Sequence, residues 1–144
     1  MEEKNIVVKN SGVINLQFFD DFPDGNIIIA EGKKNVPFEM KRVYYINNLF
    51  NKKSVRGKHA HKELEQIIFC INGRFTLDLD DGINKQSIVL EEAHQGVRLG
   101  PKLWHEMRGF SNDCVILVFA SDYYDEDDYI RSYDDFLKFV NNNK

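Results

Sequence analysis

The stretch RGKHAHKELEQ, residues 56–66, contains the clearest fold signal in the chain. It places His59 and His61 two residues apart, and alternate side chains of a β-strand point to the same face of a sheet. Both imidazoles therefore face one side. Glu65 and Gln66 follow at the start of an apolar run, where only one of the two can share that side. The stretch predicts an extended segment that directs two histidines into one cavity.

Short apolar or alternating segments surround this stretch from Ile6 to about Ala120. Turn residues such as Asn72-Gly73 separate them, at the even spacing typical of an antiparallel sandwich or barrel. The predicted strands cover residues 13–18, 26–31, 41–46, 64–71, 74–80, 84–90, 96–99, 105–110 and 114–120. Residues 127–140 change to acidic residues ahead of apolar positions at helical spacing, which predicts a short C-terminal helix that covers the barrel. We therefore expect an all-β fold in one domain, residues 1–144.

Composition limits the classes of partner. The 144 residues carry a net charge of -4, which argues against a protein that binds mainly nucleic acid or anionic lipid. No apolar run approaches the roughly 20 residues of a membrane span, and the first ten residues lack an export signal, so we expect a cytoplasmic protein. Cys70 and Cys114 lie in apolar runs and are expected to be reduced, buried thiols.

A third histidine completes the pattern. His105 follows the turn Gly100-Pro101 and Trp104. Together with Gly57, the His-x-His pair, Glu65 and Gly73, this arrangement resembles the two motifs of the cupin superfamily, and the resemblance implies a jelly-roll barrel. His94 falls outside the pattern and is expected at the surface.

Two chemical interpretations fit these residues. His59, His61, Glu65 and His105 could bind a divalent metal, since imidazole and carboxylate groups suit iron, manganese, nickel or zinc. The same groups could act as acids and bases in a metal-free pocket. If Gln66 faces inward instead of Glu65, the metal site lacks its charged ligand, because a neutral amide is a poor ligand.

A closer resemblance extends over nearly the whole chain from Gly12. The matching segments are residues 36–46 (VPFEMKRVYYI), 56–66, 100–107 (GPKLWHEM), 120–125 and 128–134 (DYIRSYD). They resemble the sugar 3,4-ketoisomerases that act on dTDP-4-keto-6-deoxyglucose. That family implies a metal-free homodimer without organic cofactor, which makes the 3-keto sugar that an aminotransferase then uses for surface glycans. One departure is Asp24, where family members commonly carry arginine.

The reaction assigns roles to particular residues. Histidine suits proton transfer near neutral pH, so His59 and His61 are the expected catalytic pair, in line with the family. Arginine suits a diphosphate, a donor must face the enediolate oxygen, and a flat ring suits thymine or the sugar. The substrate-binding candidates are Arg42, Tyr45, Arg56, Gln66, Arg98, Trp104 and His105. For Arg131 we expect a surface ion pair.

Three other functions compete with the isomerase. A metal-dependent cupin such as a small dioxygenase would contain stoichiometric metal. A nucleotide-sugar 3,5-epimerase would invert stereocentres without moving the carbonyl. A non-catalytic sugar-binding cupin would tolerate loss of His59.

Overall fold

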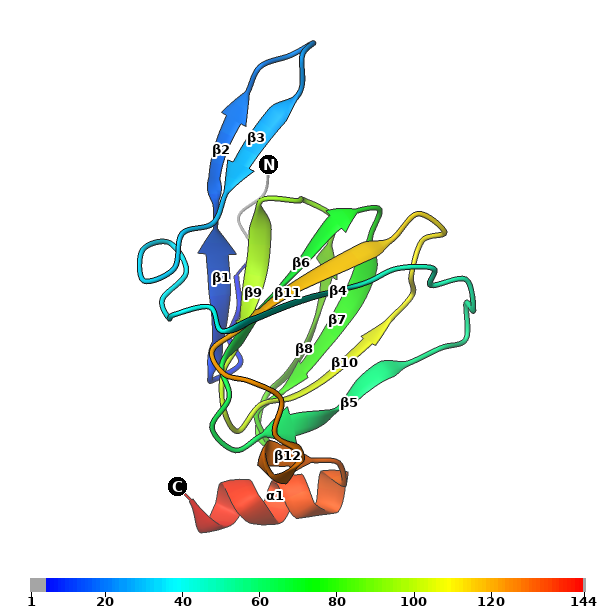
Figure 1. Cartoon of the computed structure of the whole chain (residues 1–144). Helices are drawn as coiled ribbons and strands as arrows, with labels where there is room; N and C mark the ends of the chain where they lie inside the picture. Colours follow the sequence, from blue (N-terminus) through cyan, green and yellow to red (C-terminus); the bar gives the residue numbers. More distant parts are fainter. Residues whose placement is uncertain (1–4, 144) are drawn as a thin grey trace.

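A computed structural model describes residues 5–143, and its main body is a pair of five-stranded antiparallel sheets (Figure 1). In spatial order the first sheet contains β1 (Ser11–Asn15), β9 (Gln95–Leu99), β6 (Gln66–Asn72), β11 (Val115–Ala120) and β4 (Arg42–Ile46). The second contains β12 (Tyr129–Ile130), β5 (Arg56–His61), β10 (Trp104–Arg108), β7 (Phe75–Asp80) and β8 (Lys85–Leu90). The predicted all-β barrel of the cupin type is confirmed.

The predicted strand over residues 13–18 is divided in two. Leu16 is buried, and its backbone N–H donates to the His94 carbonyl at 2.8 Å, which separates β1 from β2 (Gln17–Asp20). Among the described strands, β2 pairs only with β3 (Asn26–Ile29), and this hairpin projects away from the two sheets (Figure 1). Asp24, the departure from the family, lies in the turn between these two strands, far from the His-x-His segment.

The apolar core is divided between two layers because β6 is buried on both faces. Ile68 and Cys70 point between the sheets, where they join the side chains of β7, β9 and β11. Ile67 and Phe69 point outward into a second cluster that includes Val36 and other residues of the 30–40 segment. This explains why QIIFCI reads as a continuous apolar run instead of an alternating one.

The C-terminal helix is shorter than the prediction. α1 spans Tyr133–Asn142, and the hydroxyl of Ser132 accepts from Asp135 N as the N-cap. Residues 126–128 form a separate 3₁₀ turn, η1 (Glu126–Asp128), followed by strand β12, which the sequence analysis missed. The helix buries Phe136 against the outer face of β5 and β10. It covers the back of the segment that carries the histidines, as expected. Within residues 5–143 no helix is long and apolar enough to cross a membrane.

Candidate active site

Strands β5 and β10 bring three histidines together between the sheets. His59 and His61 alternate with Ala60, which points to the helix, and His105 is the direct partner of His59 across the strand pair. Gly57 makes this approach possible. Its φ is +83°, and an added Cβ would lie 2.9 Å from the His105 carbonyl oxygen, so only glycine allows β5 to lie this close to β10.

The rings form a compact cluster with Tyr129 of β12. The ring centroid of His59 lies 4.9 Å from His61, 4.6 Å from His105 and 4.9 Å from Tyr129. The His61 and Tyr129 centroids are 4.5 Å apart. We call His59, His61 and His105 the histidine cluster. Its members come from positions up to 46 residues apart in the chain: His59 and His61 share the predicted face of one strand, and His105 joins them from the neighbouring strand.

The hydrogen bonds of the two β5 histidines select the same tautomer. His59 Nδ1 lies 2.9 Å from the Gly57 carbonyl oxygen, which can only accept, so Nδ1 carries the proton. His61 Nδ1 lies 3.0 Å from an Asp128 carboxylate oxygen, which likewise accepts. His61 Nε2 is buried and has no hydrogen-bond partner. In the neutral form, each ring therefore keeps an unprotonated Nε2 that can accept a proton.

Burial keeps the cluster neutral. Desolvation, together with the nearby His61, lowers the pKa of His59 from 6.5 to about 4. Desolvation also lowers the pKa of His61, against the opposing effect of the bond to Asp128. The pKa of the fully buried His105 is far below its usual value for the same reason. At pH 7 all three imidazoles are bases.

A tyrosine and an amide from the opposite sheet face the same space. Gln66 is 2% exposed, and its amide N–H donates to the Tyr44 hydroxyl oxygen at 2.9 Å. That bond leaves the Tyr44 O–H free to donate elsewhere, and burial raises the pKa of Tyr44, so it stays protonated. The Arg42 guanidinium lies 5.4 Å from the centre of the Tyr44 ring. Of the predicted residues, Gln66 and Arg42 reach the site, and Tyr44 is an addition.

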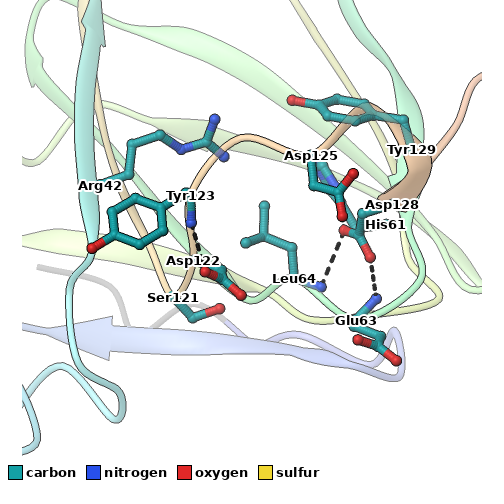
Figure 2. A pocket seen from close by; sticks show the side chains of 10 residues that line it. All are labelled: Arg42, His61, Glu63, Leu64, Ser121, Asp122, Tyr123, Asp125, Asp128 and Tyr129. Carbon is teal, nitrogen blue, oxygen red and sulfur yellow. Dashed lines mark hydrogen bonds and ion pairs between the residues drawn. The ribbon is translucent and has the colours of Figure 1, made fainter.

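A pocket of about 210 Å³ opens beside the cluster (Figure 2). His61, Tyr129 and Arg42 line it together with acidic residues of the 121–128 segment, among them Asp128. Neither Asp128 nor Tyr129 was among the predicted site residues. The segment DYIRSYD was visible as a family match, but nothing local indicates that it pairs with β5 as β12, with Tyr129 opposite His61.

Two further arginines lie near tyrosines of the site. Arg56 is exposed at the start of β5, close enough to Tyr44 for its positive charge to oppose the rise in the pKa of that phenol. Arg131 forms the ion pair expected of it, with Glu126 at 2.8 Å. Its guanidinium also lies 4.3 Å from the centre of the Tyr129 ring, and its charge contributes to lowering the pKa of His59. Arg131 therefore brings a positive charge beside the histidine cluster, and the paired Glu126 opposes its effect on His59.

Three predicted substrate-binding residues, Tyr45, Arg98 and Trp104, lie outside the site. Tyr45 pairs with Leu117, whose side chain faces outward, so Tyr45 is 67% exposed on the outer face and Tyr44 takes the inner position. Arg98 points outward between the inward-facing Val97 and Leu99. Its guanidinium binds the Glu65 carboxylate, with Nε at 2.9 Å.

Trp104 points to the helix instead of the cluster. Its ring packs against Tyr133 and Phe136, at centroid distances of 5.4 and 5.8 Å. Its indole N–H donates to a Glu106 carboxylate oxygen at 2.8 Å. The indole faces α1 because it precedes the inward-facing His105 on β10.

The ligand set considered for a metal is not assembled. Glu65 faces the outer surface with Arg98, and Gln66 occupies the inward position. Between residues 5 and 143, no group of three or more His, Cys, Asp or Glu side chains is placed to hold a metal ion. The site presents imidazoles and a phenol, which are groups suited to proton transfer, and an amide that donates to the phenol oxygen.

Comparisons with known proteins agree with this arrangement. A family model described as "FdtA: WxcM-like, C-terminal" matches residues 9–141. The TDP-4-oxo-6-deoxy-alpha-D-glucose-3,4-oxoisomerase of Aneurinibacillus thermoaerophilus is 51% identical over 116 residues, 81% of this chain and 83% of that protein.

The chain is also similar to solved structures of sugar 3,4-ketoisomerases. QdtA, a sugar 3,4-ketoisomerase from Thermoanaerobacterium thermosaccharolyticum solved in complex with TDP, is 38% identical with a TM-score of 0.91, over 95% of this chain and 98% of that chain. A histidine-to-asparagine mutant of the same protein was solved in complex with TDP-4-keto-6-deoxyglucose. A 3,4-ketoisomerase from Helicobacter canadensis is 42% identical with a TM-score of 0.86, over 92% and 98% of the two chains.

Proposed function

The chain belongs to the FdtA family of sugar 3,4-ketoisomerases, and we propose that it moves the carbonyl of dTDP-4-keto-6-deoxyglucose from carbon 4 to carbon 3. It is an isomerase whose product is a dTDP-3-keto-6-deoxyhexose, the substrate for a transamination at carbon 3. The observation that supports this most directly is the pair of neutral imidazoles, His59 and His61, with ring centroids 4.9 Å apart.

The reaction needs only protons moved between adjacent carbons. The ketone at carbon 4 acidifies the hydrogen on carbon 3, so a neutral imidazole Nε2 can remove it while a donor protonates the ketone oxygen. The result is an enediol. The oxygen on carbon 3 then loses its proton, and carbon 4 gains one, which completes the shift without net oxidation. One such positioned acid or base contributes a factor of about 100 to 10,000 in rate.

Other residues of the site have roles in this scheme. Tyr44, whose hydroxyl is oriented by Gln66, can donate to the enediolate oxygen in a dry site. In this scheme Arg42 and Arg56 bind the diphosphate, because a planar guanidinium matches phosphate oxygens. The pocket, at about 210 Å³, is smaller than the roughly 300–1,000 Å³ of typical small-molecule sites, so the nucleotide extends beyond it. His105, behind His59, orients that ring.

Incubation with dTDP-4-keto-6-deoxyglucose in deuterated water, followed by NMR, tests the proposal. We expect a 3-keto product with deuterium at carbon 4. A carbonyl retained at carbon 4, with deuterium at carbon 5, would identify a 3,5-epimerase instead. His59→Asn and His61→Asn should each lose activity by about 100-fold or more, whereas the matched control His94→Asn, outside the cluster, should not. An active His59→Asn variant would contradict the scheme.

We further propose that two copies of the chain form a homodimer. The hairpin β2–β3 carries aromatic side chains that the barrel does not cover: Phe18 is 41% exposed, Phe19 49% and Phe22 88%. Such a group of exposed rings typically marks an interaction surface. Light scattering after size exclusion should give twice the chain mass of 16.9 kDa, and Phe19→Asp should shift it toward one chain. A single-chain mass for the wild type at micromolar concentration would refute this proposal.

A cytoplasmic location is part of the same proposal. Cys70 and Cys114 are buried and not joined, although their sulfurs lie 3.9 Å apart, and free thiols are the rule in reducing compartments. Cell fractionation against marker enzymes would test this location, and recovery of the protein outside the cytoplasmic fraction would contradict it.

A further inference from the structure

Asp128 makes an unusually complete set of contacts with the chain around His61. Its Oδ2 accepts from His61 Nδ1 at 3.0 Å and from Leu64 N at 3.3 Å, and its Oδ1 accepts from Glu63 N at 2.8 Å. Its own carbonyl oxygen accepts from Lys62 N at 2.9 Å. Figure 2 shows the carboxylate bound to the backbone at Glu63 and Leu64, beside His61.

These bonds connect segments that are far apart in the sequence. Asp128 is 67 positions from His61 and is held at the end of η1, directly before β12 pairs with β5. The Asp128 side chain is 16% exposed and the His61 side chain 3%, so the bond between them is largely shielded from water. A charge-assisted hydrogen bond in such surroundings is stronger than one at the surface.

We propose that Asp128 is a positioning residue for catalysis, which keeps the proton of His61 on Nδ1 and stabilises the imidazolium that forms when Nε2 takes a proton from the sugar. The inference rests on the proposed isomerase function. Asp128 does not touch the substrate in this scheme. It acts through His61, whose Nε2 is the buried atom without a partner.

The chemistry of the carboxylate explains why no neutral residue replaces it. The Asp128 side chain accepts three hydrogen bonds through its two oxygens, an arrangement that matches the acceptors of a carboxylate. An asparagine has one acceptor oxygen, so its NH₂ group must face either the Glu63 N–H or His61. If it faces His61, the ring has to reverse its tautomer and lose the free Nε2. The same substitution behind the histidine of a serine protease lowers kcat about 10⁴-fold for this reason.

The charge matters because the rings and arginines around His61 supply no negative charge to balance its protonated form. His59 of β5, His105 of β10 and Tyr129 of β12 surround the ring, and Arg42 of β4 and Arg131 add positive charge nearby. Asp128, by contrast, places a negative charge in contact with His61. This charge opposes the fall in the pKa of His61 that burial causes.

The experiment combines ¹⁵N NMR of the imidazoles with kinetics of Asp128→Asn. Long-range ¹H–¹⁵N spectra of the wild type, assigned with His61→Gln, should show His61 protonated at Nδ1 and bare at Nε2 at pH 7. Asp128→Asn should populate the reversed tautomer, lower kcat by about 100-fold or more and leave KM little changed. Asp127→Asn is the matched control, because Asp127 is an exposed acid in the same turn. It should behave as the wild type.

Each result decides the question. A wild-type His61 with its proton on Nε2 would overturn the inference without any variant. So would an Asp128→Asn enzyme that keeps kcat within about threefold, or one whose lost activity is fully explained by a lower folded fraction in circular dichroism. The tautomer is read without substrate, so absence of isomerase activity in the wild type would refute the proposed function and still leave the Asp128 contact tested.

Discussion

Acidification should destabilise this protein well above the pH range in which carboxylates titrate, and His59 should account for a measurable part of the loss. In the unfolded chain a histidine takes up its proton near pH 6.5. In the folded protein, burial and the neighbouring His61 lower the pKa of His59 to about 4. Between these two values the unfolded state binds more protons, so the stabilising effect is complete above pH 6.5 and is lost as the pH falls toward 4.

The magnitude follows from these two values. For a group that titrates at 6.5 unfolded and about 4 folded, the free energy of unfolding falls by about 2 kcal/mol between pH 7 and pH 5. The pKa values of His61 and His105 are also lowered, so they act in the same direction. Replacing His59 by glutamine, which does not titrate, removes the contribution of His59 to this fall in the free energy of unfolding. His59→Gln should therefore lose about 2 kcal/mol less than the wild type over this range.

Urea unfolding followed by circular dichroism at pH 7, 6 and 5 measures the difference. Protein concentration must be equal throughout, because the stability of a dimer depends on it. His94→Gln, which changes a histidine outside the cluster, should keep the wild-type loss. If His59→Gln loses as much stability as the wild type between pH 7 and pH 5, His59 is not held neutral by its surroundings.

Three further substitutions test the geometry. Tyr44→Phe should lower kcat and destabilise the fold by about 1–3 kcal/mol, because it leaves the buried Gln66 amide without its partner, and urea unfolding with steady-state kinetics would measure both. Trp104→Ala should cost about 3–5 kcal/mol, measured by thermal unfolding, yet leave the KM of the folded enzyme unchanged, since its indole packs against the helix. A raised KM would instead support the predicted contact of Trp104 with the substrate. Gly57→Ala should destabilise by more than 1 kcal/mol and lower kcat, because its Cβ would displace the His105 backbone, and an unaffected kcat would argue against that contact.

The sequence predicted those features of the site that depend on residues close together in the chain. His59 and His61 share a face because they are two residues apart on a strand, whatever surrounds them. The turn predicted at Asn72-Gly73 is present, and Gly73 adopts there a φ of +72°, which glycine tolerates readily. These properties depend on neighbouring residues alone, so they could be predicted from the sequence.

Local patterns did not show which of two adjacent residues on a strand faces the site. On β4, Tyr44 and Tyr45 have the same chemistry, and the pairing with β11 decides that Tyr44 faces inward. On β6 the run is apolar on both faces, because each face meets its own core, and its pattern therefore does not indicate whether Glu65 or Gln66 points to the histidines.

From its sequence alone, this protein was recognisable as a histidine-bearing β-barrel, since strand periodicity and turn chemistry act over a few residues, and its segments resembled those of a known enzyme family. Only the tertiary structure decided which side of each strand meets the pocket and which carboxylate stands behind His61. The physical reason is that both depend on pairing between distant segments, above all the contact of β12 with β5 that brings Asp128 to a residue 67 positions away.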